Sequence, residues 1–221
     1  MKNPLIALTG APQSGKSELG PLIDGLENVQ YFNLNQRGYK LRRKGSEHRY
    51  FYDSVVPDCI HDNGRFRAEY YMTIMQNRRL IDQILEFEVP KIQAYAEEII
   101  TDQTEGDIIV ASWEYWPMIF KKVTPDHVMY LHCTDQSKWY EKLRKRAKDR
   151  GYVGPPIPDA VLNQMMSAAK YDPNGMLSDI QSSIPPERLT IIDTSPDDWN
   201  QGAVMKAARK LSTKLLNPFV P

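Results

Sequence analysis

Apolar and polar positions follow two alternating patterns along most of the chain. Five short segments have the length and composition of β-strands, namely residues 4–9, 29–33, 107–112, 127–132 and 188–193. Between them, apolar residues recur at helical spacing, as in 136–150 and 159–170. Strands that alternate with helices predict a three-layer α/β fold, in which helices cover both faces of a parallel sheet of about five strands. We expect the functional site at the carboxyl ends of these strands.

Between the second and third predicted strands lies a long region without strand character, residues 36–105. Helical spacing predicts a helix or a broken pair of helices over 65–84. Pro90 is expected to begin another helix, because proline is favoured at the first helical position. Residues 150–158 are rich in glycine and proline and predict a loop, and a final helix is expected over 199–216.

The composition fits one domain, residues 1–221. Of the 221 residues, 41% are hydrophobic and 25% are charged, which is enough apolar material for one core of good size. The formal net charge is zero, so we expect no overall attraction to nucleic acid or to a membrane. Cys59 and Cys133 lack the spacing of metal ligands, which favours free thiols in a reducing compartment and therefore the cytoplasm. The first residues resemble neither a signal peptide nor a membrane span.

The strongest chemical signal is the segment 10–17, GAPQSGKS, which fits the phosphate-binding pattern G-x-x-x-x-G-K-[ST] at every fixed position. It lies between the first predicted strand and a helix expected over 17–26, which is the context that the pattern requires. Glycines let backbone N–H groups approach phosphates, Lys16 would reach the β- and γ-phosphates, and Ser17 would hold Mg²⁺. We therefore expect ATP and Mg²⁺. The residues expected to bind ATP here are Gly10, Gln13, Ser14, Gly15, Lys16, Ser17 and Glu18.

Residues 6–20, IALTGAPQSGKSELG, resemble the opening of dephospho-CoA kinases, which belong to the nucleoside monophosphate kinase-like group of P-loop proteins. The order and spacing of later segments extend the resemblance over most of the chain, through GRFR, IIVASWE, HVMYLHCTD and RLTIIDTS. It implies a P-loop kinase in which 36–105 is a substrate-binding insertion and 150–158 is a lid. The family's D-x-D acids are Asn33 and Asn35 here, and its His-Pro is Val89-Pro90.

The resemblance also implies roles for the arginines after the fourth strand. Arg146 corresponds to an arginine near the ATP adenine, and Arg150 to a lid arginine that closes on the phosphates and acts in catalysis. Ser195 takes the place of the adenine loop, where helix capping is the alternative role. Lys142, Lys145 and Lys148 make the same helix basic all round, so a solvated basic face is the alternative for its arginines, and Arg144 is left open.

Glu114 follows a predicted buried strand, where P-loop enzymes carry an acid associated with Mg²⁺, so we expect a catalytic role for it. Asn33 is a second catalytic candidate and Asn35 a substrate-binding one, with turn formation as their alternative role. Two amides in place of carboxylates favour an acceptor that already carries an anionic oxygen, although Asp53, Glu114 or Asp24 could supply a base. The segment that covers the acceptor offers guanidinium groups for a phosphate, on Arg65, Arg67, Arg78 and Arg79.

Three functions follow from these observations. The first is an ATP-dependent kinase of a small nucleotide, with a nucleoside or deoxynucleoside monophosphate ahead of dephospho-CoA. Residues 36–52 interleave six Arg or Lys residues with aromatic rings, and we interpret them as no part of the core. The second function starts from the longer basic and aromatic stretch between Arg37 and Tyr71. Such a stretch suits stacked bases, and a kinase of a modified base in DNA, of the 5-hydroxymethyluracil type, would use it. The third is a nucleotide-binding protein without turnover. The sequence carries no signal for an oligomeric state.

Overall fold

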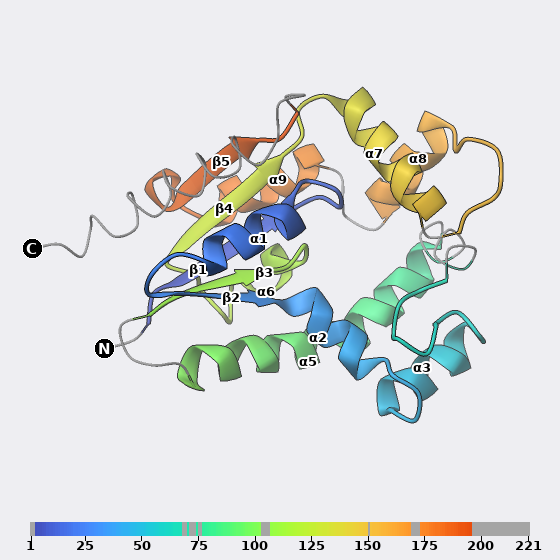
Figure 1. Cartoon of the computed structure of the whole chain (residues 1–221), viewed down its shortest axis with the longest axis horizontal. Coiled ribbons are helices and arrows are strands. Elements are labelled where there is room, and N and C mark those ends of the chain that lie inside the picture. Colours follow the sequence, from blue (N-terminus) through green and yellow to red (C-terminus); the bar gives the residue numbers. More distant parts are fainter. Residues whose placement is uncertain are drawn as a thin grey trace, which may run out of the picture.

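The computed structural model of the chain describes residues 3–67, 70, 74, 77–102, 107–149, 151–168 and 173–195. Within them, parallel strands form one sheet in the order β2-β3-β1-β4-β5 (Figure 1). The strands are β1 (Leu5–Gly10), β2 (Val29–Asn33), β3 (Ile108–Ser112), β4 (His127–His132) and β5 (Leu189–Asp193). The α/β prediction is confirmed, and each strand agrees with its predicted segment to within one residue at either end.

Helices flank the sheet and gather at the carboxyl ends of its strands (Figure 1). Those before β3 are α1 (Lys16–Asp24), α2 (Leu34–Leu41), α3 (Glu47–Val55) and α5 (Arg78–Asp102). Those after β3 are α6 (Trp116–Ile119), α7 (Gln136–Asp149), α8 (Asp159–Ala168), α9 (Pro173–Ser183) and the 3-10 helix η1 (Pro186–Arg188). Arg150 and the predicted helix over 199–216 lie outside the described residues.

Helices cover both faces of the sheet. Because side chains alternate along each strand, neighbouring residues of one strand pack into different clusters. Ile6 and Leu8 of β1 belong to a small cluster with Leu19 and Ile23 of α1. Leu5 and its alternate neighbours point to the other face, into a larger cluster shared with α5, α6 and α9. This double covering explains why β1 is buried at all six positions and reads as a continuous apolar run in the sequence.

Two predictions for the middle of the chain are wrong. Pro90 lies inside this 25-residue helix and does not begin a new one. An internal proline costs about 3 kcal/mol, but burial of each large aliphatic side chain contributes about 1.5–3 kcal/mol, so an apolar face that continues past Pro90 outweighs it. The members of that face are Leu80, Ile81, Ile84, Leu85, Ile92, Ala96 and Ile99. The predicted helical start at 65 is also wrong, since Phe66 forms an antiparallel bridge with Ile60.

The interpretation of residues 36–52 as lying outside the core is wrong as well. Tyr52 is completely buried, and Arg42 and His48 are buried with it. Phe51 stacks on Phe87 of α5 with ring centroids 3.9 Å apart. The segment therefore turns most of its rings inward, onto α5, and Tyr50 is its exposed exception.

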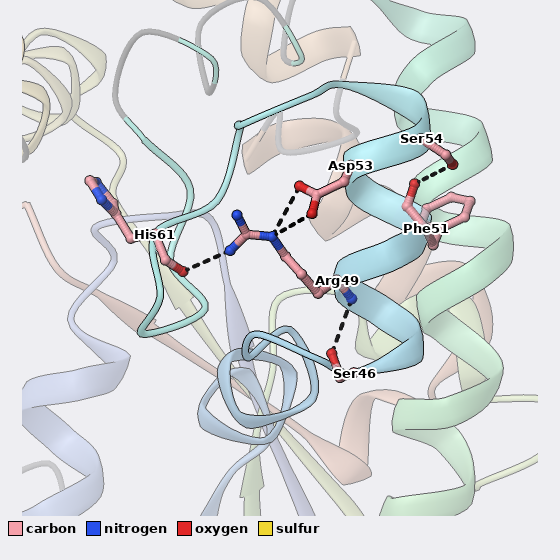
Figure 2. Close-up of polar contacts among 6 residues, drawn as sticks. All are labelled: Ser46, Arg49, Phe51, Asp53, Ser54 and His61. Carbon is pink, nitrogen blue, oxygen red and sulfur yellow. Dashed lines mark hydrogen bonds and ion pairs between the residues drawn. The ribbon is translucent and has the colours of Figure 1, made fainter.

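α3 is held in place by its own polar residues (Figure 2). The hydroxyl of Ser46 caps its start by accepting from the backbone N–H of Arg49 at 3.0 Å. The Arg49 Nε donates to both carboxylate oxygens of Asp53, at 3.0 and 2.9 Å, while another guanidinium nitrogen reaches the carbonyl oxygen of His61 at 3.5 Å. These contacts tie α3 to the loop that follows it. No helix in the described part of the chain is long and apolar enough to cross a membrane.

Candidate active site

The glycine loop between β1 and α1 has the backbone that its sequence predicts. Gln13 and Gly15 have φ angles of 66° and 95°, and Gly10 has a φ of 149°. A Cβ on Gly10 would lie 2.7 Å from the Ser14 hydroxyl oxygen and closer still to a carbonyl of β4, so only glycine fits there. The loop is also held from outside, because the indole N–H of Trp139 in α7 donates to the Pro12 carbonyl at 2.7 Å.

Lys16 lies at the centre of the loop and is only 8% exposed. Its Nζ donates to the carbonyl oxygens of Gly10 at 2.7 Å and Ala11 at 2.9 Å, and to the Ser14 hydroxyl at 3.4 Å. Burial lowers the pKa of Lys16, while the negative charge of Glu114 acts in the opposite direction. A buried ammonium whose hydrogen-bond partners are all neutral is suited to receive an anion.

The start of α1 adds a second feature that fits a polyphosphate. The N-cap is Gly15, which has no side chain to cap the first N–H groups of the helix. Ser17 and Glu18 follow in the first turn and are exposed to the same space. The residues present therefore fit a triphosphate, and the Ser17 hydroxyl fits a Mg²⁺ ligand. No group of three His, Cys, Asp or Glu side chains among the described residues could hold a metal ion, so Mg²⁺ here would depend on phosphate oxygens.

Three neighbouring cavities meet at this loop. The loop cavity, of about 500 Å³, is lined by residues 12–18 together with Tyr31, Asn33, Asn35, Arg65, Glu114 and Arg146. The α7 cavity, of about 600 Å³, lies between the loop and α7, and the inner cavity, of about 120 Å³, lies between α2, α5 and the end of β3. Arg146 lines all three cavities, while Asn35, Arg65 and Glu114 line both the loop cavity and the inner cavity.

Asn33, the last residue of β2, and Asn35, two residues further on, have different roles. The side-chain oxygen of Asn33 caps α2 by accepting from the backbone N–H groups of Asn35 at 3.1 Å and Gln36 at 3.3 Å. The side-chain amide of Asn35 donates to the carboxylate of Glu114, two residues beyond β3. Asn35 therefore fixes the direction of Glu114 at the junction of the loop cavity and the inner cavity.

The remaining candidates from the sequence fall into two groups. Arg146 and Ser195 line the α7 cavity, and the Ser195 hydroxyl also accepts from the backbone N–H of Asp135 at 2.7 Å. Arg67 and Arg78 line none of the three cavities. The backbone N–H of Arg67 donates to the carbonyl of residue 59, and Arg78 forms an exposed ion pair with residue 82 at 2.9 Å.

Asp53 and Asp24, which the sequence offered beside Glu114 as possible bases, both form other contacts. Asp53 is paired with Arg49, and Asp24 accepts from the backbone N–H of Tyr31 at 3.0 Å. Among the aromatic residues beside Glu114, Trp113 lines the inner cavity. Trp116 is fully buried and its indole donates to a β3 carbonyl at 2.8 Å, which makes it part of the core.

Sequence reasoning missed the polar end of the inner cavity, which is formed by Arg42 and Glu88. The Arg42 guanidinium donates to the Glu88 carboxylate at 2.9 Å, across 46 residues of sequence. No local spacing connects two residues so far apart, so only the packing of α2 on α5 brings the pair together. Tyr39 also lines the inner cavity, although its sequence neighbours show only that it belongs to a basic and aromatic stretch.

Comparison with known proteins supports the fold. No protein-family model matches the chain, and no curated protein matches its sequence. Among solved structures, TT1252 from Thermus thermophilus has a TM-score of 0.54 at 12% identity, covering 98% of this chain and 99% of its own. A dephospho-CoA kinase from Campylobacter jejuni has a TM-score of 0.53 at 11% identity, with coverage of 96% and 97%. A shikimate kinase from Bacteroides thetaiotaomicron has a TM-score of 0.49 at 11% identity, with coverage of 96% and 98%. The chain thus shares its α/β fold with TT1252 and with the dephospho-CoA kinase, and at this low identity the resemblance to dephospho-CoA kinases stays at the level of the fold.

Proposed function

We propose that the protein is an ATP-dependent kinase that transfers the γ-phosphoryl group to a small nucleotide, with a nucleoside or deoxynucleoside monophosphate as the leading acceptor. The observation that carries this proposal is the junction of two cavities. The loop cavity contains the features of a triphosphate site around Lys16, and the lining that it shares with the inner cavity includes the polar residues Asn35, Arg65, Glu114 and Arg146, beside Pro12 and Tyr39. A phosphoryl donor in one cavity and an acceptor in the other would meet at these polar residues.

The residues proposed to bind ATP and the residues at the junction each have a role that their chemistry supports. The Lys16 ammonium would exchange its loop carbonyl partners for phosphate oxygens, and Ser17 would hold Mg²⁺, which neutralises phosphate charge when bound. Arg65 and Arg146 bring positive charge to the transferred group, and Arg150 is proposed to add to it from the lid. The transfer itself forms a bond between an acceptor oxygen and the γ-phosphorus as the bond to the β,γ-bridging oxygen breaks and ADP leaves.

The role of Glu114 depends on the chemistry of the acceptor. A monophosphate presents an oxygen that is already anionic, so no base is required, and Glu114 would orient water around Mg²⁺. A hydroxyl acceptor would need a base, and among the described residues Glu114 is the carboxylate that lines both cavities. The inward packing of residues 36–52 leaves few exposed rings for stacked bases, so we propose a free nucleotide and not a base in DNA.

Labelled ATP offered with panels of acceptors tests this function. The panels are nucleoside monophosphates, dephospho-CoA, shikimate, gluconate and an oligonucleotide that contains 5-hydroxymethyluracil. We expect label on a nucleotide, and we expect Lys16→Met to lower the rate by about 100-fold or more, since one group that stabilises transition-state charge is typically worth that much. Lys121→Met, which changes an exposed lysine outside the three cavities, is the matched control. Unchanged turnover in Lys16→Met would refute the assignment of the loop.

A further inference from the structure

The inner cavity ends on a buried ion pair. The Arg42 side chain is 7% exposed and that of Glu88 is 17% exposed, and they join α2 to α5 at 2.9 Å. The Arg42 Nε donates to the carbonyl oxygen of Gly64 at 3.1 Å. Its guanidinium carbon lies 4.9 Å from the ring centre of Phe66 and 5.3 Å from that of Tyr39. The group is therefore fixed in one plane by two hydrogen bonds and by the rings around it.

Stabilisation of the fold is by itself a weak explanation for a buried ion pair. Removing two charges from water is expensive, and buried ion pairs can often be replaced by apolar residues at no cost. The cavity around this pair is otherwise largely apolar, with walls from Ile81, Ile84, Leu85, Ile92 and Trp113. A fixed donor and a fixed acceptor at the end of an apolar cavity are instead typical of a site that recognises a ligand.

The pair lies away from the transfer point. Arg42 and Glu88 line the inner cavity but not the loop cavity, whereas Arg65 and Glu114 line both. An acceptor in the inner cavity would then turn its reacting oxygen toward Arg65 and Glu114 and its other end toward Arg42 and Glu88. Because Glu88 compensates the charge of Arg42, this far end suits a neutral group and not a second phosphate.

We propose that Arg42 and Glu88 recognise the hydrogen-bonding edge of a nucleobase, and that this selects a nucleotide as the acceptor. A base edge carries an acceptor, either a carbonyl oxygen or a ring nitrogen, beside an N–H donor in one plane. The guanidinium donates to the acceptor, and the carboxylate accepts from the N–H. Sugars and hydroxy acids lack this planar pair. The inference rests on the proposed function, because it takes the inner cavity as the acceptor site.

Gly38 keeps the space that this recognition needs. It lies in α2, where glycine costs about 1 kcal/mol relative to alanine, and it lines the inner cavity. A Cβ at this position would lie 3.3 Å from a terminal guanidinium nitrogen of Arg42 and 3.7 Å from its central carbon. A side chain there would therefore press on the guanidinium, and glycine leaves Arg42 room to hold its position at the end of the cavity.

Equilibrium binding tests the inference without requiring turnover. The wild-type chain, with its loop cavity filled by a non-hydrolysable ATP analogue and Mg²⁺, is titrated by calorimetry with nucleoside monophosphates and with ribose 5-phosphate. We expect the best nucleotide to bind at least about tenfold more tightly than ribose 5-phosphate, because a site built around polar groups rejects ligands that leave them unpaired. Methylation of the edge nitrogen, as in N3-methylthymidine or 1-methylguanosine monophosphate, should cost at least about tenfold again. Equal affinity for nucleotides and ribose 5-phosphate would overturn the inference, as would equal affinity for the methylated and unmethylated ligands.

Variants of Glu88 and Arg49 test whether the Arg42–Glu88 pair causes the loss of affinity on methylation. In Glu88→Met, which keeps the length of the side chain but removes both carboxylate oxygens, the methylation penalty should fall to about threefold or less, while the same penalty persists in Arg49→Gln, which disrupts the ion pair with Asp53 outside the three cavities (Figure 2). An undiminished penalty in folded Glu88→Met would overturn the role of the pair. If Glu88→Met does not fold, the ligand comparison in the wild-type chain still decides.

The proposed function can fail separately. If nucleotides bind with the expected selectivity but labelled phosphate is never transferred, the kinase proposal fails and the recognition stands. If label moves to ribose 5-phosphate as readily as to nucleotides, the recognition fails and the kinase proposal stands.

Discussion

Replacement of Trp139 by phenylalanine tests whether the phosphate loop is held from outside. Trp139 is 1% exposed, and its indole N–H donates to the carbonyl of Pro12, inside the loop, at 2.7 Å. Phenylalanine keeps an aromatic ring there but removes the donor. The Pro12 carbonyl is then left without this buried partner, which costs about 1–3 kcal/mol.

Part of that loss should appear in ligand binding. A loop that is no longer fixed by α7 must be ordered when a nucleotide binds, and each 1.4 kcal/mol of ordering lowers affinity about tenfold. We therefore expect Trp139→Phe to lower the free energy of unfolding by about 1–3 kcal/mol and to weaken Mg·ATP binding by about tenfold. Urea denaturation measures the first and titration calorimetry measures the second.

Trp116 provides the matched control. It is 0% exposed, and its indole donates to the carbonyl of Ala111 at 2.8 Å, so Trp116→Phe loses the same group and the same kind of hydrogen bond away from the loop. It should lose similar stability while changing Mg·ATP affinity much less. Equal losses of affinity in the two variants would refute the reasoning, because the bond to Pro12 would then have no special effect on the loop.

Three further changes test other parts of the site. Gly20→Ala should destabilise the fold by about 1–3 kcal/mol by overpacking, since a Cβ there would overlap the ring of Tyr31, and thermal denaturation measures it. Asp193 has a pKa below its ordinary 3.8, because burial raises it but hydrogen bonds lower it more. The Asp193 carboxylate therefore stabilises the fold above that value, and this stabilisation is lost as the pH falls through the lowered pKa. In Asp193→Asn the free energy of unfolding, measured by urea denaturation at several pH values, should therefore fall less steeply in acid. Asn35→Asp would put a second carboxylate against Glu114, so charge repulsion should lower the free energy of unfolding at neutral pH and much less in acid, where the carboxyl groups are protonated; equal losses at both pH values in urea denaturation would contradict their contact.

The sequence predicted the sheet well because the physics of its strands is local. Strands buried on both faces are apolar at nearly every position, and residues 4–9 and 127–132 show this directly. The backbone of the glycine loop is local for a similar reason, since its left-handed angles depend on residues that are adjacent in sequence. In both cases the signal and the structure occupy the same short stretch.

The helical region was predicted less well because packing between distant segments decides it. Pro90 has a strong local preference for a helix start, but the apolar face of α5 continues on both sides of it. Arg42 and Tyr52 have the composition of an exposed segment, yet they are buried because α2 and α3 pack on α5. Neither outcome is visible in a window of ten or fifteen residues.

The contact between Asn35 and Glu114 explains why an amide is suitable at position 35. A carboxylate at position 35 would face Glu114 and repel it, whereas the Asn35 amide donates to Glu114 and holds it in place. The junction between the loop cavity and the inner cavity thus keeps one carboxylate, carried after β3 and not after β2. Amides in place of carboxylates at the end of β2 therefore do not by themselves indicate an inactive site. It indicates that any step requiring a carboxylate at this junction depends on Glu114, and that Asn35 and Glu114 must be varied together to separate orientation from chemistry.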